Sequence, residues 1–237
     1  FHAAETYINR LTEKGYKAAI CEQVEDPRQA KGMVKREVVR VVTPGTTLNT
    51  QALDETKNNY IMSLVYIDEI FGIAVADVTT GDCFLTEVNK SRKLLDEINK
   101  FSPAEIICNE PFYMCGIDIQ DMRNRLGITV YSLDNWYFDD ELCRRALLEH
   151  FRVKTLEGLG LKDYDCGVIA AGALFQYLTE TQKTSLSHMT TITPYITDCF
   201  MLIDSSSRRN LELVETLREK QKRGSLLWVL DKTKTAM

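Results

Sequence analysis

The chain has 237 residues, of which 44% are hydrophobic and 27% are charged, and its formal net charge is −5. This length and composition suit one or two globular domains, which excludes a disulfide-stapled mini-protein and a mostly disordered chain. No stretch approaches 18 consecutive apolar residues and no signal peptide is visible, so we expect a cytoplasmic protein without membrane contact.

Cysteine and histidine residues give no sign of a metal site. The seven cysteines are scattered without a C-x-x-C pair, and only three histidines are present. A zinc site needs closely spaced cysteine and histidine ligands. We therefore expect no metal, and we expect reduced cysteines that serve as small apolar residues.

Charge is unevenly distributed along the chain. Residues 58–183 carry 20 acidic and 12 basic side chains, whereas the two flanks together carry 14 acidic and 17 basic ones. Because contact with phosphate needs lysine and arginine at the surface, we expect any contact with DNA to come from a flank.

The first 57 residues predict a helix, two strands and a linker. Apolar residues recur at helical spacing over 2–14, and Gly15 ends that pattern. Residues 17–24 are expected to form a buried strand, and 36–42 form a second strand that the Thr-Pro-Gly-Thr sequence at 43–46 ends. Residues 46–57 are polar and without period, and predict a linker.

Residues 58–185 predict an α/β domain. Runs at 60–67, 71–78 and 83–88, separated by short turns, predict an antiparallel three-strand meander. Strands at 105–108 and 128–133 then alternate with helices, the first of them capped by Ser91 and a later one starting near Asp139. A strongly apolar helix is expected at 166–182. Antiparallel strands followed by parallel strands with helices form a mixed sheet in an RNase H-like order.

The last block, 186–237, predicts less regular structure. We expect a short strand at 200–203, a polar cap cluster at 204–207 and a charged helix from about Arg208 to Lys222. The chain begins at Phe1 inside a predicted helix and stops at Met237 without a terminal signal. We therefore expect a segment of a longer protein, in which partial domains flank the α/β domain.

Asp77, with Asp82 and Glu87 nearby on the meander, is a candidate catalytic residue. A metal-dependent nuclease of RNase H-like fold places a Mg²⁺-binding aspartate on its first strand and needs further carboxylates from other elements. The later helices offer no obviously matched carboxylates, and an aspartate that enters a turn more often accepts backbone hydrogen bonds. A nuclease that uses Asp77 is therefore the alternative hypothesis, and a structural Asp77 is preferred.

Common catalytic motifs are absent from the sequence. It contains no G-x-x-x-x-G-K-[ST], G-x-G-x-x-G or G-x-S-x-G, so we expect no nucleotide hydrolysis and no enzyme activity from this chain. His150, at the end of a predicted helix, is interpreted as a partner of the helix dipole.

Two basic stretches are candidates for contact with phosphate. The first contains Lys31, Lys35, Arg36 and Arg40, and the second covers 208–223. From composition alone, the preferred interpretation is a solvated strand edge for the first and an ion-paired helix face for the second.

One long string carries the most specific signal. Residues 16–46, YKAAICEQVEDPRQAKGMVKREVVRVVTPGT, closely resemble the end of the mismatch-recognition domain in the MutS family of DNA mismatch repair proteins. Shorter strings that resemble the same family follow in its order: DVTTG at 77–81, AAGAL at 170–174, QYL at 176–178, RRNLE at 208–212 and LDKTKTAM at 230–237.

The resemblance implies a domain organisation and a role. Residues 1–45 resemble the end of the mismatch-recognition domain, 58–185 the connector domain and 186–237 the start of the core or lever domain. The family's connector is RNase H-like without nuclease activity, which implies a relay between mismatch recognition and the ATPase and a docking surface for MutL. The residues that read the mispaired base and the Walker motifs are expected outside this chain.

The resemblance also implies partners and contact residues. A full-length family member is expected to be a homodimer that binds mismatched double-stranded DNA and uses ATP and Mg²⁺. This chain is expected to need no cofactor of its own. Lys31, Lys35 and Arg36 match the basic loop and strand of the recognition domain and are the candidate contacts to the DNA backbone.

Overall fold

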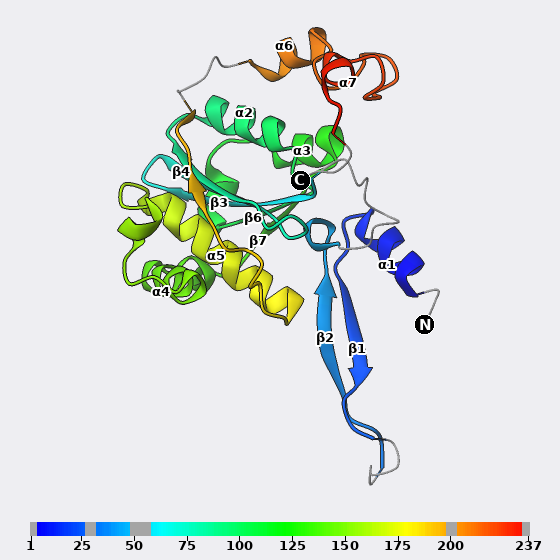
Figure 1. Cartoon of the computed structure of the whole chain (residues 1–237), viewed down its shortest axis with the longest axis vertical. Coiled ribbons are helices and arrows are strands. Elements are labelled where there is room, and N and C mark those ends of the chain that lie inside the picture. The colour runs from blue at the N-terminus through cyan, green and yellow to red at the C-terminus, as the bar shows by residue number, and fades with distance from the viewer. Residues whose placement is uncertain (1–3, 27–31, 48–57, 198–202, 234–237) are drawn as a thin grey trace.

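A two-stranded ribbon and a larger α/β body make up the chain. The computed structural model describes residues 4–26, 32–47, 58–197 and 203–233. The ribbon projects from one side of the body, and helices cover both faces of the sheet inside the body (Figure 1). Within these described ranges, no helix is long and apolar enough to cross a membrane.

The ribbon contains the two strands predicted near the N-terminus. Helix α1 (Ala4–Thr12) is followed by Gly15, whose φ of +80° is a conformation that favours glycine. Strands β1 (Ala18–Gln23) and β2 (Arg36–Val42) pair in antiparallel register, with Gln23 opposite Arg36. The expectation of a buried first strand is wrong, because the ribbon extends away from the body and most of β1 is exposed.

A six-stranded mixed sheet forms the centre of the body, in the order β7-β6-β3-β4-β5-β8. Strands β3 (Tyr60–Ile67), β4 (Ile70–Asp77) and β5 (Cys83–Val88) form the predicted antiparallel meander. Strands β6 (Glu105–Cys108) and β7 (Thr129–Ser132) continue from β3 in parallel. Strand β8 (Thr193–Pro194) pairs parallel to β5 and was not predicted, because two residues that include a proline give no strand signal.

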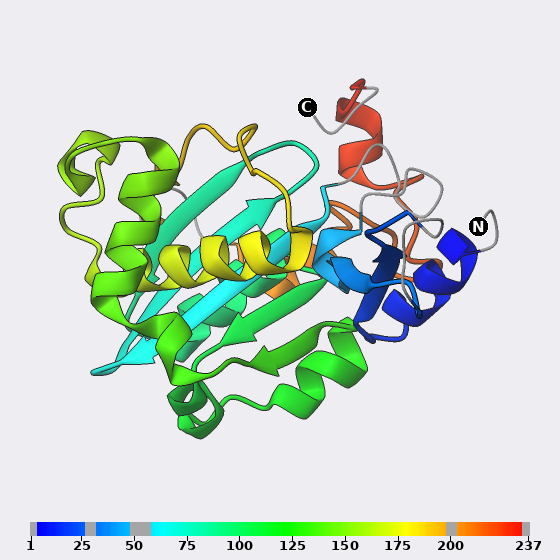
Figure 2. The ribbon, with the colours of Figure 1, turned by 90° about the horizontal axis from the view of Figure 1, so that it is seen from below.

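Helices pack on both faces of the sheet (Figures 1 and 2). Helices α4 (Asp140–Phe151) and α5 (Asp165–Gln182) cover one face, and α2 (Ser91–Phe101) and α3 (Ile119–Leu126) cover the other. Alternation along β4 places Ala74 and Ala76 in the core under α5, and Ile73 and Val75 in the core under α2. The small residues on the first face allow α5 to lie close to the sheet.

Two predicted helix starts have different outcomes. Helix α4 starts near Asp139, as predicted, and the structure adds that Asp139 is its N-cap, whose carboxylate accepts the backbone N–H of Leu142. Ser91 is not a cap. Ser91 is already the first residue of α2, and Lys90 occupies the N-cap position. The backbone carbonyl of Lys90 accepts the N–H of Leu94.

The C-terminal block differs most from its prediction. Asp204 caps α6 (Ser205–Asn210) by accepting the N–H of Ser207, but the helix does not continue to Lys222. The backbone turns at Glu212, where φ is +47°, and α7 (Leu226–Leu230) folds back so that its first two N–H groups donate to Glu212 and Leu213. Of the strand predicted at 200–203, residues 200–202 lie outside the described residues and Ile203 is not in a strand.

Candidate functional site

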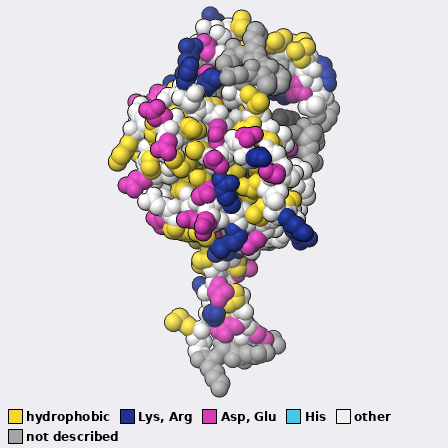
Figure 3. Space-filling view, turned by 90° about the vertical axis from the view of Figure 1, so that its left-hand side faces the viewer, with side chains coloured by type: hydrophobic (Ala, Val, Ile, Leu, Met, Phe, Trp, Pro, Cys, Tyr) yellow, Lys and Arg dark blue, Asp and Glu magenta, His cyan; other side chains and the backbone are white. Residues whose placement is uncertain are grey.

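The predicted contacts to the DNA backbone lie at the far end of the ribbon. Lys35 and Arg36 are exposed neighbours where β2 begins, and Lys31 lies outside the described residues. Lys35 Nζ is 2.6 Å from Glu37 Oε1, and this carboxylate raises the pKa of Lys35. Figure 3 shows acidic and basic side chains together on the ribbon, so its field is weaker than the basic residues alone would produce.

The inner end of the ribbon is fixed to the body by one buried carboxylate. Glu105, the first residue of β6, is completely buried. Its Oε2 accepts the backbone N–H of Gly45 at 3.0 Å, and its Oε1 accepts the hydroxyl of Tyr177 on α5 at 2.5 Å. Glu105 therefore joins the turn that ends the ribbon to both the sheet and the main helix of the body.

The turn that receives Glu105 has little freedom. Thr43 and Thr46 are fully buried, and the N–H of Thr43 donates to the hydroxyl of Thr46 at 3.0 Å. A Cβ on Gly45 would lie 2.9 Å from the Cβ of Ile61, so this position needs glycine for close approach. Residues 46 and 47, expected to begin a linker, are instead buried in this turn, and 48–57 lie outside the described residues.

A second contact ties the start of the ribbon to the body. The hydroxyl of Tyr131 on β7 donates to the carbonyl of Gly15 at 2.5 Å, and the Lys17 ammonium lies 4.0 Å from the centre of the Tyr131 ring. Burial lowers the pKa of Lys17, and the nearby Glu105 charge raises it in part. Burial and the Glu105 charge also raise the pKa of Tyr131 to about 12. We call Gly15, Lys17, Gly45, Glu105, Tyr131 and Tyr177 the ribbon joint.

Asp77 has the structural role that the sequence favours. It is completely buried, and its Oδ1 accepts the N–H and the hydroxyl of Thr79 at 2.7 and 2.5 Å. Its Oδ2 accepts the N–H of Asn59 at 2.9 Å, and the Asn59 amide in turn donates to the carbonyl of Pro44. Asp77 thus orders the β4–β5 turn and the entry to β3 beside the ribbon joint.

The other two carboxylates of the nuclease hypothesis do not converge on Asp77. Asp82 accepts the hydroxyl of Thr80, and Glu87 accepts the N–H of Gly167 at 2.8 Å, where burial raises its pKa. Within the described part of the chain, no group of three histidine, cysteine, aspartate or glutamate residues is placed to bind a metal ion. The arrangement gives no support to a metal-dependent nuclease.

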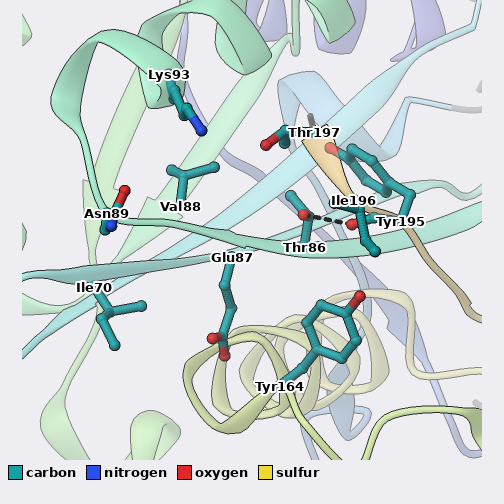
Figure 4. A pocket seen from close by; sticks show the side chains of 10 residues that line it. All are labelled: Ile70, Thr86, Glu87, Val88, Asn89, Lys93, Tyr164, Tyr195, Ile196 and Thr197. Carbon is teal, nitrogen blue, oxygen red and sulfur yellow. Dashed lines mark hydrogen bonds between the residues drawn. The ribbon is translucent and has the colours of Figure 1, made fainter. Parts of the chain in front are cut away.

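A pocket of about 290 Å³ lies at the β5 edge of the sheet (Figure 4). Glu87 and Tyr164 lie on the α5 side of the strand, and Lys93 lies on the other side. The Thr86 hydroxyl donates to the carbonyl of Tyr195 at 2.6 Å and fixes the segment after β8 to this edge. The Glu87 carboxylate in this pocket is bound to the backbone N–H of Gly167 at the start of α5.

His150 and Arg208, the first residue of the second basic stretch, each contact another segment of the body. His150 Nε2 is 2.7 Å from the carbonyl of Met189, and its ring packs on Phe175, so it joins two segments instead of only facing the helix dipole. Arg208 Nη1 donates to the carbonyl of Asn99 at 3.0 Å. The residues of the first basic stretch lie at two places on the ribbon. Arg40 donates to the carbonyl of Thr46 beside the ribbon joint, whereas Lys35 and Arg36 are exposed at the ribbon tip.

The sequence did not predict a functional role for Glu105 or Tyr177. Their signal is weak: one glutamate opens an otherwise apolar four-residue strand, and one tyrosine lies in a mostly apolar helix. A charged residue in a buried strand needs a partner, but 72 residues separate this glutamate from the tyrosine.

Comparison with known proteins gives consistent matches over the whole chain. The family model of MutS domain II matches residues 59–190, and that of MutS domain I matches residues 1–51. The chain is 64% identical over its full length to a DNA mismatch repair protein MutS of Lachnoclostridium phytofermentans, and covers 25% of that protein. Proteins of the same name from Ruminiclostridium cellulolyticum and Acetivibrio thermocellus are 49% and 44% identical across the whole chain, which covers 27% of each. The chain spans about a quarter of the length of these relatives.

Proposed function

Because the chain belongs to the MutS family of DNA mismatch repair proteins, we propose that it links contact with mismatched DNA to the rest of a longer, ATP-using protein. The ribbon tip contacts the DNA backbone, and the body fixes the direction of the ribbon. Glu105 carries this proposal, since one buried carboxylate accepts hydrogen bonds from the ribbon turn and from α5. A joint of this kind transmits a displacement of the ribbon instead of absorbing it.

The body suits a connector role. Its strand order, with an antiparallel meander extended by parallel strands, supports an RNase H-like connector domain. Its sequence is acidic, which favours contact with a protein over contact with DNA. The family resemblance supports MutL as that partner. It also supports a full-length protein that is a homodimer in the cytoplasm and that binds ATP and Mg²⁺ outside this chain.

The ribbon tip is expected to bind duplex DNA without reading its sequence. Each phosphate contact contributes about 0.9 to the slope of log affinity against log salt. The double variant Lys35→Gln/Arg36→Gln is therefore expected to reduce this slope by about 1 to 2 and the affinity by about tenfold. Homoduplex and mismatched DNA should be affected alike in a fluorescence titration of the chain at low and moderate salt.

Lys154→Gln provides the matched control for this titration. Lys154 is exposed on the body, far along the chain from the ribbon, and its replacement changes the charge by the same amount per residue. We expect it to bind like the unchanged chain. An equal loss in Lys154→Gln, or no loss in the double variant, would contradict a DNA contact at the ribbon tip.

The relay itself is tested in the intact protein with Glu105→Gln. The amide keeps the size of the side chain but removes the negative charge that strengthens both hydrogen bonds. Its NH2 group cannot bond to the Gly45 N–H, and it bonds to the Tyr177 hydroxyl only if that hydroxyl changes from donor to acceptor, so the joint is weakened. We expect mismatched DNA to bind almost as tightly, while the change in ATP hydrolysis that a mismatch produces falls about fivefold or more. Glu110→Gln, an exposed glutamate of the body, is the control. An unchanged mismatch response in Glu105→Gln would overturn the proposed function.

A further inference from the structure

Arg208 connects the C-terminal segment to the end of α2. From α6 its Nη1 donates to the carbonyls of Asn99 and Lys100, at 3.0 and 3.4 Å. Carbonyls in the last turn of a helix have no partner within the helix and carry partial negative charge, which suits a guanidinium. Figure 1 shows α6 beside α2 on the side of the body away from the ribbon tip.

The end of α2 leads directly to the glutamate of the ribbon joint. Ser102 adopts a left-handed conformation with φ of +46°, and its hydroxyl donates to the carbonyl of Asn99 at 2.9 Å. Asn99 therefore accepts from both Ser102 and Arg208. Pro103 fixes the next backbone angle, the N–H of Ala104 donates to Tyr60, and Glu105 then opens β6. Residues 99–105 form what we call the α2–β6 corner.

Packing around the corner leaves it little room to bend. The ring of Phe101 lies 5.2 Å from Tyr60 and 5.8 Å from Phe84, between centroids. The buried Glu97, one turn earlier, accepts the hydroxyl of Tyr195 at 2.6 Å and the ammonium of Lys100 at 3.2 Å. A shift of the end of α2 therefore moves Glu105 with it.

We propose that Arg208 is a positioning residue that fixes the α2–β6 corner and, through it, the Glu105 contact to the ribbon. This inference rests on the proposed function, because it gives the path by which the ribbon and segment 203–233 are coupled. The two contacts lie at opposite ends of the corner, at Asn99 and at Glu105. Loss of the Arg208 contact removes one restraint on the end of α2, and the packing of Phe101 and Glu97 transmits the resulting shift to Glu105.

Hydrogen exchange in the intact protein, measured on peptides by mass spectrometry, tests the coupling. Arg208→Gln is expected to speed exchange about tenfold over 203–210 and about threefold or more over 42–47, where the N–H of Gly45 is bound to Glu105. Arg208→Lys keeps a donor that reaches one carbonyl and should restore most of the protection over 42–47. Arg209→Gln changes the same charge at an exposed neighbour and should leave 42–47 unchanged.

The outcomes separate the inference from the proposed function. Faster exchange over 203–210 with unchanged exchange over 42–47 overturns the role of Arg208, and the Glu105→Gln test of the relay is unaffected. Equal acceleration over β4 also overturns it, because that result shows a general loss of stability. If Glu105→Gln itself leaves exchange over 42–47 unchanged, the joint and the proposed function both fail.

Discussion

Gly72→Ala is expected to destabilise the chain by about 3 kcal/mol, although it adds only one methyl group. A Cβ at this position would lie 2.1 Å from the carbonyl oxygen of Cys166 and 2.3 Å from its carbonyl carbon. Both are backbone atoms at the start of α5, so the helix must move away from the sheet as a whole. The melting temperature should fall by about 10 °C in a thermal unfolding experiment.

Gly158→Ala is the matched control for this experiment. A Cβ on Gly158 would meet nothing within 4 Å, and its backbone is not in the left-handed region. Its melting temperature should stay within about 2 °C of that of the unchanged chain. A Gly72→Ala variant as stable as this control would show that α5 does not lie against β4 at the distance described.

Asp77→Ala is expected to cost about 3 to 5 kcal/mol of the free energy of unfolding. The carboxylate is completely buried and accepts from the N–H groups of Asn59 and Thr79 and from the Thr79 hydroxyl. Alanine leaves these donors without an acceptor and opens a cavity. Denaturant unfolding measures the loss, and Asp163→Ala, an exposed aspartate of the body, should change it by less than about 0.5 kcal/mol.

The same variant distinguishes the structural role from the nuclease hypothesis. A metal-ligating aspartate in a nuclease is under repulsion from its neighbours, so its removal leaves stability unchanged or raises it and abolishes Mg²⁺-dependent cleavage. A stable Asp77→Ala variant that loses such cleavage would contradict the role assigned to Asp77. A destabilised variant, with no cleavage in the unchanged chain, is the expected result.

Local patterns predicted most of the body. The apolar runs of β3, β4 and β5, separated by short turns, predicted the meander, and the apolar run of α5 predicted the main helix, because strands and helices buried on both faces need continuous apolar sequence. The start of α4 near Asp139 was predicted from a local signal too, the acidic residues that a helix N-terminus favours. Within the C-terminal block, the charged helix failed because Glu212 turns the backbone and accepts the N–H of Leu217, which composition does not indicate.

The ribbon joint could not be predicted from the sequence because its residues are far apart along the chain. The bonds from Glu105 to Gly45 and Tyr177 span 60 and 72 residues, and pairing at such separations depends on the finished fold. For Asp77, the sequence predicted the local hydrogen bonds in the turn with Thr79. It did not predict the hydrogen bond from the N–H of Asn59, which lies 18 residues away. The resemblance at 16–46 supplied Lys31, Lys35 and Arg36, which stay predictions until DNA binding is measured.

The central claim is that Glu105 holds the ribbon at a fixed angle to the body. Two spin labels report on that angle directly. Cys21 is exposed on the ribbon and takes one label, and Gly158→Cys takes the other on the body. Cys115 and Cys199 are first replaced by serine so that they do not compete.

Pulsed electron resonance then gives the distribution of distances between the two labels. We predict a narrow distribution for the chain with Glu105, a clearly broader one for Glu105→Gln, and no change for the exposed Glu110→Gln. A distribution that is already broad with Glu105 present, or that stays equally narrow in Glu105→Gln, would contradict the claim.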